Sequence, residues 1–255
     1  MPMMGMVIIL VFVYFTCIGL ILSYSDHINP KYGTLFFVIL DVIFFLGFYV
    51  NNARNSSSFT FMTFDNISPF TFTMIPFMYL VKDKVRQWFL NAISFFSVGM
   101  FLAMLITPQY AYLFSFTVNA SMDYVLDALC HLNCSLFGIY LIASKQVKID
   151  FSSLKKAVLF MYGVVAFGVT MNFLFKKNFF GMGPYSNFSI YMFDFFDDYW
   201  ITLLAYLIGI FVVLAIGYQS NYLLQRLSGH YQNIEEDINI IRDEEAEAHE
   251  GENIV

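Results

Sequence analysis

The sequence has little cysteine, and several diagnostic residues of known seven-helix proteins are missing. Its three cysteines, Cys17, Cys130 and Cys134, all lie inside apolar stretches, so we expect no disulfide that ties a loop and infer no redox compartment. The last apolar stretch, residues 199–218, contains no lysine, which excludes a retinal protein with a Schiff base there. No acidic-Arg-aromatic triplet follows the third stretch and no Asn-Pro-x-x-Tyr closes the last, which argues against a G-protein-coupled receptor.

Charge is scarce as well, because only 13% of the 255 residues are charged whereas 59% are hydrophobic. The mean hydropathy of +0.66 is above that of an ordinary soluble domain. Within a bilayer no water satisfies the backbone, so long apolar runs must form helices. We predict an all-α, polytopic membrane protein whose seven transmembrane helices fill a domain over residues 1–222. The predicted spans are 6–23, 32–50, 67–81, 88–106, 124–143, 156–175 and 199–218.

The basic residues fall mainly on alternate connections between these spans. Ten of the 13 lie in segments that are cytoplasmic if the N-terminus is outside, and only Arg54, Lys176 and Lys177 then face out. This asymmetry predicts an outside N-terminus and a cytoplasmic C-terminus. We expect an integral protein of the cell membrane, with membrane lipids as partners and with neither a nucleic-acid partner nor a cofactor.

The fifth predicted span carries a polar face. Asp127, His131, Cys134 and Gly138 are spaced by 4, 3 and 4 residues, which places them on one side of a helix. Ionisable groups are costly in hydrocarbon, so this face should point into the bundle or a wet cavity. Three interpretations stay open: a structural Asp127–His131 pair, acid–base catalysis by His131 on a lipid or acyl substrate, and metal binding. A lone helix supplies no fourth ligand, so no metal site is predicted.

Asp41, in the middle of the second predicted span, is the other intramembrane outlier. No lysine or arginine lies at mid-span to pair with it, so the carboxyl should be protonated or find a partner such as His131 or a hydroxyl. One hypothesis is a purely structural acid that is hydrogen-bonded to a neighbouring helix. Another is a proton relay with His131, as in a small-solute or proton-coupled transporter.

Several short motifs follow one another in an order that is typical of a known family. They are the Ser-Pro-Phe-Thr-Phe-Thr run at 68–73, Thr107-Pro108, His131 nine residues before Tyr140, and Asn172 with Asn178. Over residues 69–218 this order resembles the YwaF-type integral membrane family, which is related to an ether-phospholipid acyltransferase. The resemblance implies a membrane scaffold that handles lipids or acyl chains.

The sequence departs from that family at the opening of the third span. The family has a histidine and a nucleophilic cysteine there, and this chain has Thr71 and Thr73, while His131 is retained. A threonine hydroxyl is a much weaker nucleophile than a thiol. The resemblance therefore implies either a catalytically silent member or a thiol role for Cys134, one helical turn from His131. His131, Thr73 and Cys134 are the catalytic candidates, and the expected polar cavity is lined by Asp41, Thr71, Asp127, Asn172 and Asn178.

Beyond the last span the apolar residues take up a coiled-coil spacing. The repeat is 3-4-3-4-3 over Leu224, Leu227, Tyr231, Ile234, Ile238 and Ile241, which predicts an amphipathic cytoplasmic helix over 223–242. Residues 243–255 form an acidic segment that is predicted to be disordered. The seam either binds a partner, which is a second copy or another protein, or packs on the chain's own loops. The alternative function is thus a non-enzymatic membrane subunit that docks a partner through this tail.

Overall fold

The computed structural model describes residues 2–55, 67–106, 122–176, 179–181 and 199–229. Every regular element within these ranges is helical, so the predicted all-α class is confirmed. Each of the seven predicted apolar stretches corresponds to one α-helix. The helices are α1 (Pro2–Tyr24), α2 (Pro30–Asn55), α3 (Ile67–Phe77), α4 (Asp83–Ile106), α5 (Met122–Ala143), α6 (Phe151–Phe175) and α7 (Tyr199–Leu227), with 3-10 turns η1 (Ser25–His27) and η3 (Phe179–Gly181).

Three of the described helical segments are long and apolar enough to cross a membrane. These segments are Pro30–Val50, Phe151–Phe175 and Tyr199–Leu227, while Val11–His27 and Ala128–Ala143 are shorter apolar helices. A helix rises about 1.5 Å per residue, so the 11 residues of α3 cover roughly half of a hydrocarbon core. By length and composition, the chain is a helical protein that associates with a membrane.

The third helix ends earlier than its apolar run predicts. The sequence indicates a span to residue 81, whereas α3 ends at Phe77, directly after Pro76. Proline lacks an N–H group and disrupts the helical hydrogen-bond pattern. The chain then turns, with the N–H of Met78 bonded to the carbonyl of Ile75 and that of Leu80 to Phe77, at 3.4 and 2.9 Å. The last apolar residues of the run therefore belong to a turn.

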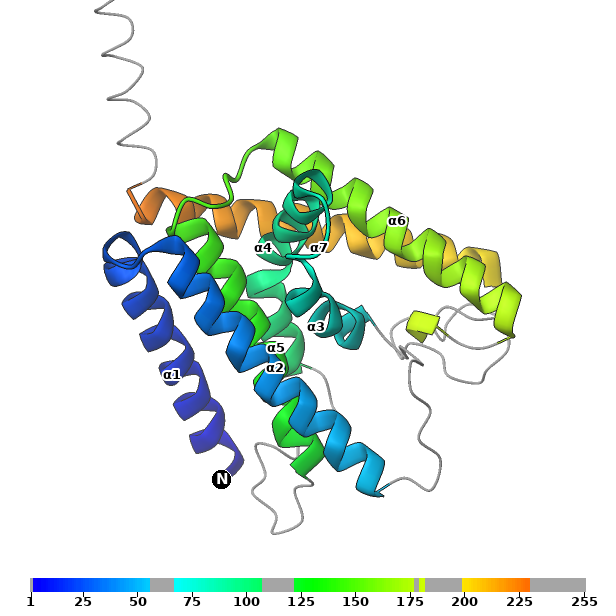
Figure 1. Cartoon of the computed structure of the whole chain (residues 1–255), viewed down its shortest axis with the longest axis horizontal. Helices are drawn as coiled ribbons and strands as arrows, with labels where there is room; N and C mark the ends of the chain where they lie inside the picture. The colour runs from blue at the N-terminus through cyan, green and yellow to red at the C-terminus, as the bar shows by residue number, and fades with distance from the viewer. Residues whose placement is uncertain (1, 56–66, 107–121, 177–178, 182–198, 230–255) are drawn as a thin grey trace, which may run out of the picture.

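The central helix of the described bundle is α5, which contacts α1, α2, α3, α4 and α7 (Figure 1). In that view α1, α2 and α5 run side by side, while α6 and α7 lie along one another and cross the others at a steep angle. The short helix α3 packs against α2 and α5. The largest apolar core lies between these helices and includes Phe37, Met78, Phe95, Phe137 and Leu214.

Two glycines allow α4 to approach its neighbours closely. A Cβ atom on Gly138 of α5 would lie 2.6 Å from the Cβ of Ser97, and one on Gly217 of α7 would lie 2.2 Å from the carbonyl oxygen of Phe95. Small residues at such crossings let helix backbones pack against one another, as in many membrane bundles. The helix α4 is therefore held tightly between α5 and α7.

The last helix continues past its predicted end at residue 218 and across the predicted domain boundary at 222, as far as Leu227. Asn221 and Gln225 are both 0% exposed in this extension and bond to other segments, which hydropathy alone does not show. Gly229 follows in the left-handed conformation with φ of 72°. Residues 230–242 of the predicted tail helix and the acidic segment 243–255 lie outside the described residues.

Candidate functional site

The most unusual buried group is the carboxyl of Asp41, at the middle of α2. The residue is 0% exposed and lies beside Asn133 and Cys134 of α5. Neither carboxyl oxygen has a hydrogen bond of good geometry to any described residue. The Asn133 amide nitrogen donates instead to the carbonyl oxygen of Phe37, one turn before Asp41, at 3.1 Å. The carboxyl is thus enclosed by protein, and the Asn133 amide is its polar neighbour.

Close packing of α2 on α5 places Asp41 there. A Cβ on Gly33 would lie 2.0 Å from the hydroxyl oxygen of Tyr140, so only glycine admits that ring. The Tyr140 hydroxyl donates to the carbonyl oxygen of Pro30 at 3.3 Å. The Phe37 ring lies 5.6 Å from that of Phe137 and 5.3 Å from that of Tyr140, between centroids. These contacts fix the position of α2 along α5, and with it the depth of Asp41.

His131 is buried, with 8% of its surface exposed, and it shares a helical face of α5 with Ser135 and Gly138. Ser135 and Gly138, four and seven residues later on that face, both meet α4, since the Ser135 hydroxyl donates to the Ser97 carbonyl oxygen at 2.5 Å. Helical spacing thus places His131 on the same side of α5 as the two residues that meet α4, while Cys134 lies near Asp41. Asp127 belongs to α5, but its side chain lies outside the described part.

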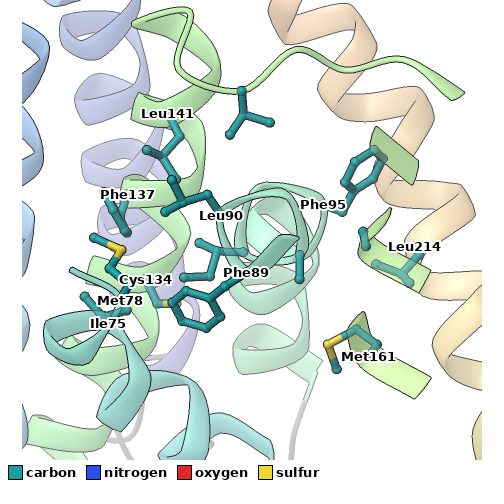
Figure 2. Close-up of a cluster of buried hydrophobic side chains, with 14 of the residues drawn as sticks. Ile75, Met78, Phe89, Leu90, Phe95, Cys134, Phe137, Leu141, Met161 and Leu214 are labelled. Carbon is teal, nitrogen blue, oxygen red and sulfur yellow. The ribbon is translucent and has the colours of Figure 1, made fainter. Parts of the chain in front are cut away.

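The two nucleophile candidates, Cys134 and Thr73, and their neighbours Cys130 and Thr71 lie in or beside the core. Cys130 and Cys134 are 0% exposed, and Figure 2 shows Cys134 among Ile75, Met78 and Phe137. Thr71 of α3 is buried and Thr73 is half-buried. In this conformation no substrate ester can contact the Cys134 sulfur.

Asn172 bonds to the turn that follows α6. Its amide nitrogen donates to the carbonyl oxygen of Phe179 at 3.2 Å, and its oxygen accepts from the N–H of the same residue. Both polar atoms of the side chain therefore help to close the end of the helix, which is a structural role. Asn178, the other predicted cavity residue there, lies outside the described residues.

A buried polar network that sequence reasoning missed joins four helices. The Tyr14 hydroxyl of α1 bonds to that of Ser135 at 2.6 Å. The Ser97 hydroxyl of α4 donates to the Asn221 oxygen at 3.1 Å, and the Asn221 nitrogen donates to the Ser94 carbonyl oxygen at 2.6 Å. Ser94 takes part only through its backbone carbonyl, and its own hydroxyl is buried without a partner among the described residues.

Two residues of the predicted tail seam, Leu224 and Leu227, are described, and they differ in burial. Leu224 packs against the small core cluster that contains Tyr14 and Ile18, whereas Leu227 is 65% exposed. The other four seam residues, Tyr231, Ile234, Ile238 and Ile241, lie outside the described residues. Leu224 therefore packs on the chain's own bundle.

The described residues contain no group of three or more His, Cys, Asp and Glu side chains that could hold a metal ion. Comparison of the chain with protein families, with curated proteins and with solved structures finds no match. The chemistry of the site therefore has to be inferred from its own residues. Those residues offer a secluded carboxyl at Asp41 and an enclosed thiol at Cys134.

Proposed function

We propose that the chain is a multi-pass membrane protein that handles lipids or acyl chains on a YwaF-like scaffold without thiol catalysis. The proposal leaves out thiol catalysis because Cys134 is enclosed by apolar side chains and is 0% exposed. Acyl transfer through a cysteine requires its sulfur to reach the substrate carbonyl as a thiolate. Thr73, where the resembling family has its thiol, offers only a weakly nucleophilic hydroxyl.

Lipids as the ligand class are supported by the resemblance and by the surface of the helices. Large apolar side chains point outward on several helices, as on Phe12, Leu174 and Trp200, which are 71%, 68% and 64% exposed. The short α3, with Thr71 and Thr73, packs against the two helices that hold Asp41 and Asn133. Seven spans, an outside N-terminus and a cell-membrane location complete this proposal.

The test is mass spectrometry of the protein purified in a mild detergent, before and after incubation with an ether phospholipid. We expect bound lipid on the wild type and on Cys134→Ala, reduced lipid on Thr71→Leu, and no covalent acyl adduct on any of the three. An adduct on the wild type that Cys134→Ala removes would establish thiol catalysis. If the chain retains no more lipid than an unrelated membrane protein does in the same detergent, lipid handling is rejected.

The unpartnered carboxyl favours a second candidate function, a proton-coupled transporter. Ionisable residues inside membrane spans commonly mark ion or proton pathways, and Asp41 lies at the middle of a segment long enough to cross. A carboxyl without a fixed hydrogen-bond partner can exchange a proton without first breaking a stable bond. Asn133 supplies a polar neighbour on the facing helix.

Proton movement into sealed vesicles that contain the purified chain tests this candidate. A pH-sensitive dye inside the vesicles should report acidification under a membrane potential with the wild type, and Asp41→Asn should abolish it because the amide cannot titrate. Cys134→Ala, which changes a neighbouring side chain without removing the carboxyl, is the matched control. Equal fluxes through wild type and Asp41→Asn would end the transporter hypothesis.

A further inference from the structure

Several helix ends meet at one end of the bundle, where side chains tie them together. Gln146, after α5, exchanges hydrogen bonds with Thr34 near the start of α2 at 3.0 and 3.1 Å. The Gln87 amide of α4 donates to the Gln146 carbonyl oxygen at 3.4 Å. Gln225 of α7 accepts from the N–H of Ile149 at 2.5 Å and donates to its carbonyl oxygen at 3.2 Å. The starts of α2, α4 and α6 therefore lie with the ends of α5 and α7.

This end carries most of the basic residues of the chain. We define the basic face as the nine found there, none of which is buried: Lys31, Lys82, Lys84, Arg86, Lys145, Lys148, Lys155, Lys156 and Arg226. The acidic residues in the same segments are Asp26, Asp83 and Asp150, and one of them joins η1 to this end through a 3.6 Å ion pair with Lys145. The opposite ends of the described helices carry Arg54 and Lys176. The bundle is therefore strongly asymmetric in charge.

Three cations of the basic face lie over aromatic rings. The pairs are Lys84 with Trp88, Arg86 with Tyr79 and Arg226 with Tyr222, at 5.7, 5.9 and 5.6 Å from the ring centroids. Tryptophan and tyrosine gather at the boundary between hydrocarbon and headgroups, and basic side chains there extend toward the headgroups. Such pairs of rings and cations are typical of the end of a helical bundle that lies at a membrane surface.

Large apolar side chains are exposed between the lysines. Tyr32, Leu80 and Phe151 are 72%, 79% and 76% exposed, and each lies within three residues of a lysine. A bilayer accommodates both kinds of group, since the apolar side chains enter the acyl region while the cations meet the phosphates. The acidic segment 235–252 of the chain itself has nine acids to pair with the lysines, but it would leave these three side chains in water. The mixture favours a lipid surface as the occupant.

We propose that the basic face binds the phosphate headgroups of anionic phospholipids in the leaflet at this end of the bundle. Each lysine near such a surface strengthens the attraction by about fivefold, and salt screens it over the Debye length. The lipid here is held by charge at the membrane surface. The site is therefore separate from Asp41 and from the lipid handling proposed above, and either proposal can fail without the other.

Two strained lysines supply a matched pair of variants. Lys145 follows α5 and Lys176 follows α6, and both adopt the left-handed conformation, with φ of 61° and 52°. Glycine is the residue favoured at such helix ends, so Lys145→Gly and Lys176→Gly relieve the same kind of strain and remove one charge each. They differ in that only Lys145 belongs to the basic face.

The experiment is a titration of the full-length protein, in neutral detergent, with fluorescent phosphatidylglycerol and with phosphatidylcholine of the same acyl chains. We expect tighter binding of phosphatidylglycerol, about fivefold weaker binding on Lys145→Gly, and about a hundredfold weaker binding when Lys31, Lys84 and Lys145 are all changed to Gln. Lys176→Gly should bind as the wild type does, and about 0.5 M salt should remove the preference.

Equal affinity for the two lipids, or an equal loss on Lys145→Gly and Lys176→Gly, would overturn the proposal. So would a preference that high salt leaves unchanged. If the acidic segment of the chain is the true occupant, the wild type will show no preference for phosphatidylglycerol, and changing Asp243, Glu244, Glu245 and Glu247 to their amides will create one. That result would assign the basic face to the tail and reject the lipid.

Discussion

Two buried polar regions of the bundle use similar residue types in opposite ways. Around α4, the polar groups of Tyr14, Ser97, Ser135 and Asn221 bond to one another or to backbone carbonyls, although the neighbouring Ser94 hydroxyl has no partner among the described residues. Around α2, the Asp41 carboxyl is equally buried, yet neither oxygen has a partner of good geometry among the described residues. A satisfied network stabilises a fold, whereas an unpaired buried acid costs stability. The difference marks the α4 network as structural, and it supports our proposal that Asp41 serves a function.

The largest expected effect concerns the crossing of α4 and α7, which the satisfied network joins. Gly217→Ala places a Cβ 2.2 Å from the Phe95 carbonyl oxygen, so one of the two backbones must move. We expect a loss of about 1–3 kcal/mol or more in the free energy of unfolding. Gly163→Ala, where no atom lies within 4 Å, should be neutral or stabilise by up to about 1 kcal/mol. Thermal denaturation in detergent compares the two, and equal midpoints would contradict the close crossing.

A smaller effect is expected from removing one member of the network. Asn221→Ala deletes the bond to the Ser94 carbonyl oxygen and leaves the Ser97 hydroxyl without its side-chain acceptor. We expect a loss of about 1–2 kcal/mol, in the range found for hydrogen bonds between membrane helices. The measurement is the unfolding midpoint in detergent. An unchanged midpoint would mean that the network contributes nothing to stability, and the contrast with Asp41 would disappear.

The end of α7 should show a still smaller difference. Leu224→Ala removes part of the packing against Tyr14 and Ile18 and should cost about 1 kcal/mol, whereas Leu227→Ala changes an exposed side chain and should leave stability unchanged. Size measurement of both variants in detergent then tests the tail as a docking segment. Dissociation of an assembly by Leu227→Ala at constant stability would support the partner-docking alternative.

The positions of the helices followed from hydropathy, because bilayer physics ties long apolar runs to helical structure. The exceptions have local causes, such as Pro76 at the end of α3 and the buried Asn221 and Gln225 that lengthen α7. Helical spacing also placed His131 and Cys134 on the inward side of α5 correctly, since both are buried. It did not show which neighbour each would meet, because that depends on how α2 and α4 pack around α5. The position of Asn133 beside Asp41 and the bond between Asn221 and Ser97 join residues far apart in the sequence, which no local pattern contains.

The central claim is that Asp41 is not part of what holds the fold together. The most direct test is the unfolding midpoint of Asp41→Ala in detergent, measured beside wild type and Asn221→Ala. Removing an unpartnered buried carboxyl relieves a desolvation cost that offsets the small space left behind, so we predict a midpoint equal to or above that of the wild type. A fall as large as that of Asn221→Ala would show that the carboxyl has a stabilising partner, and would contradict its assignment to function.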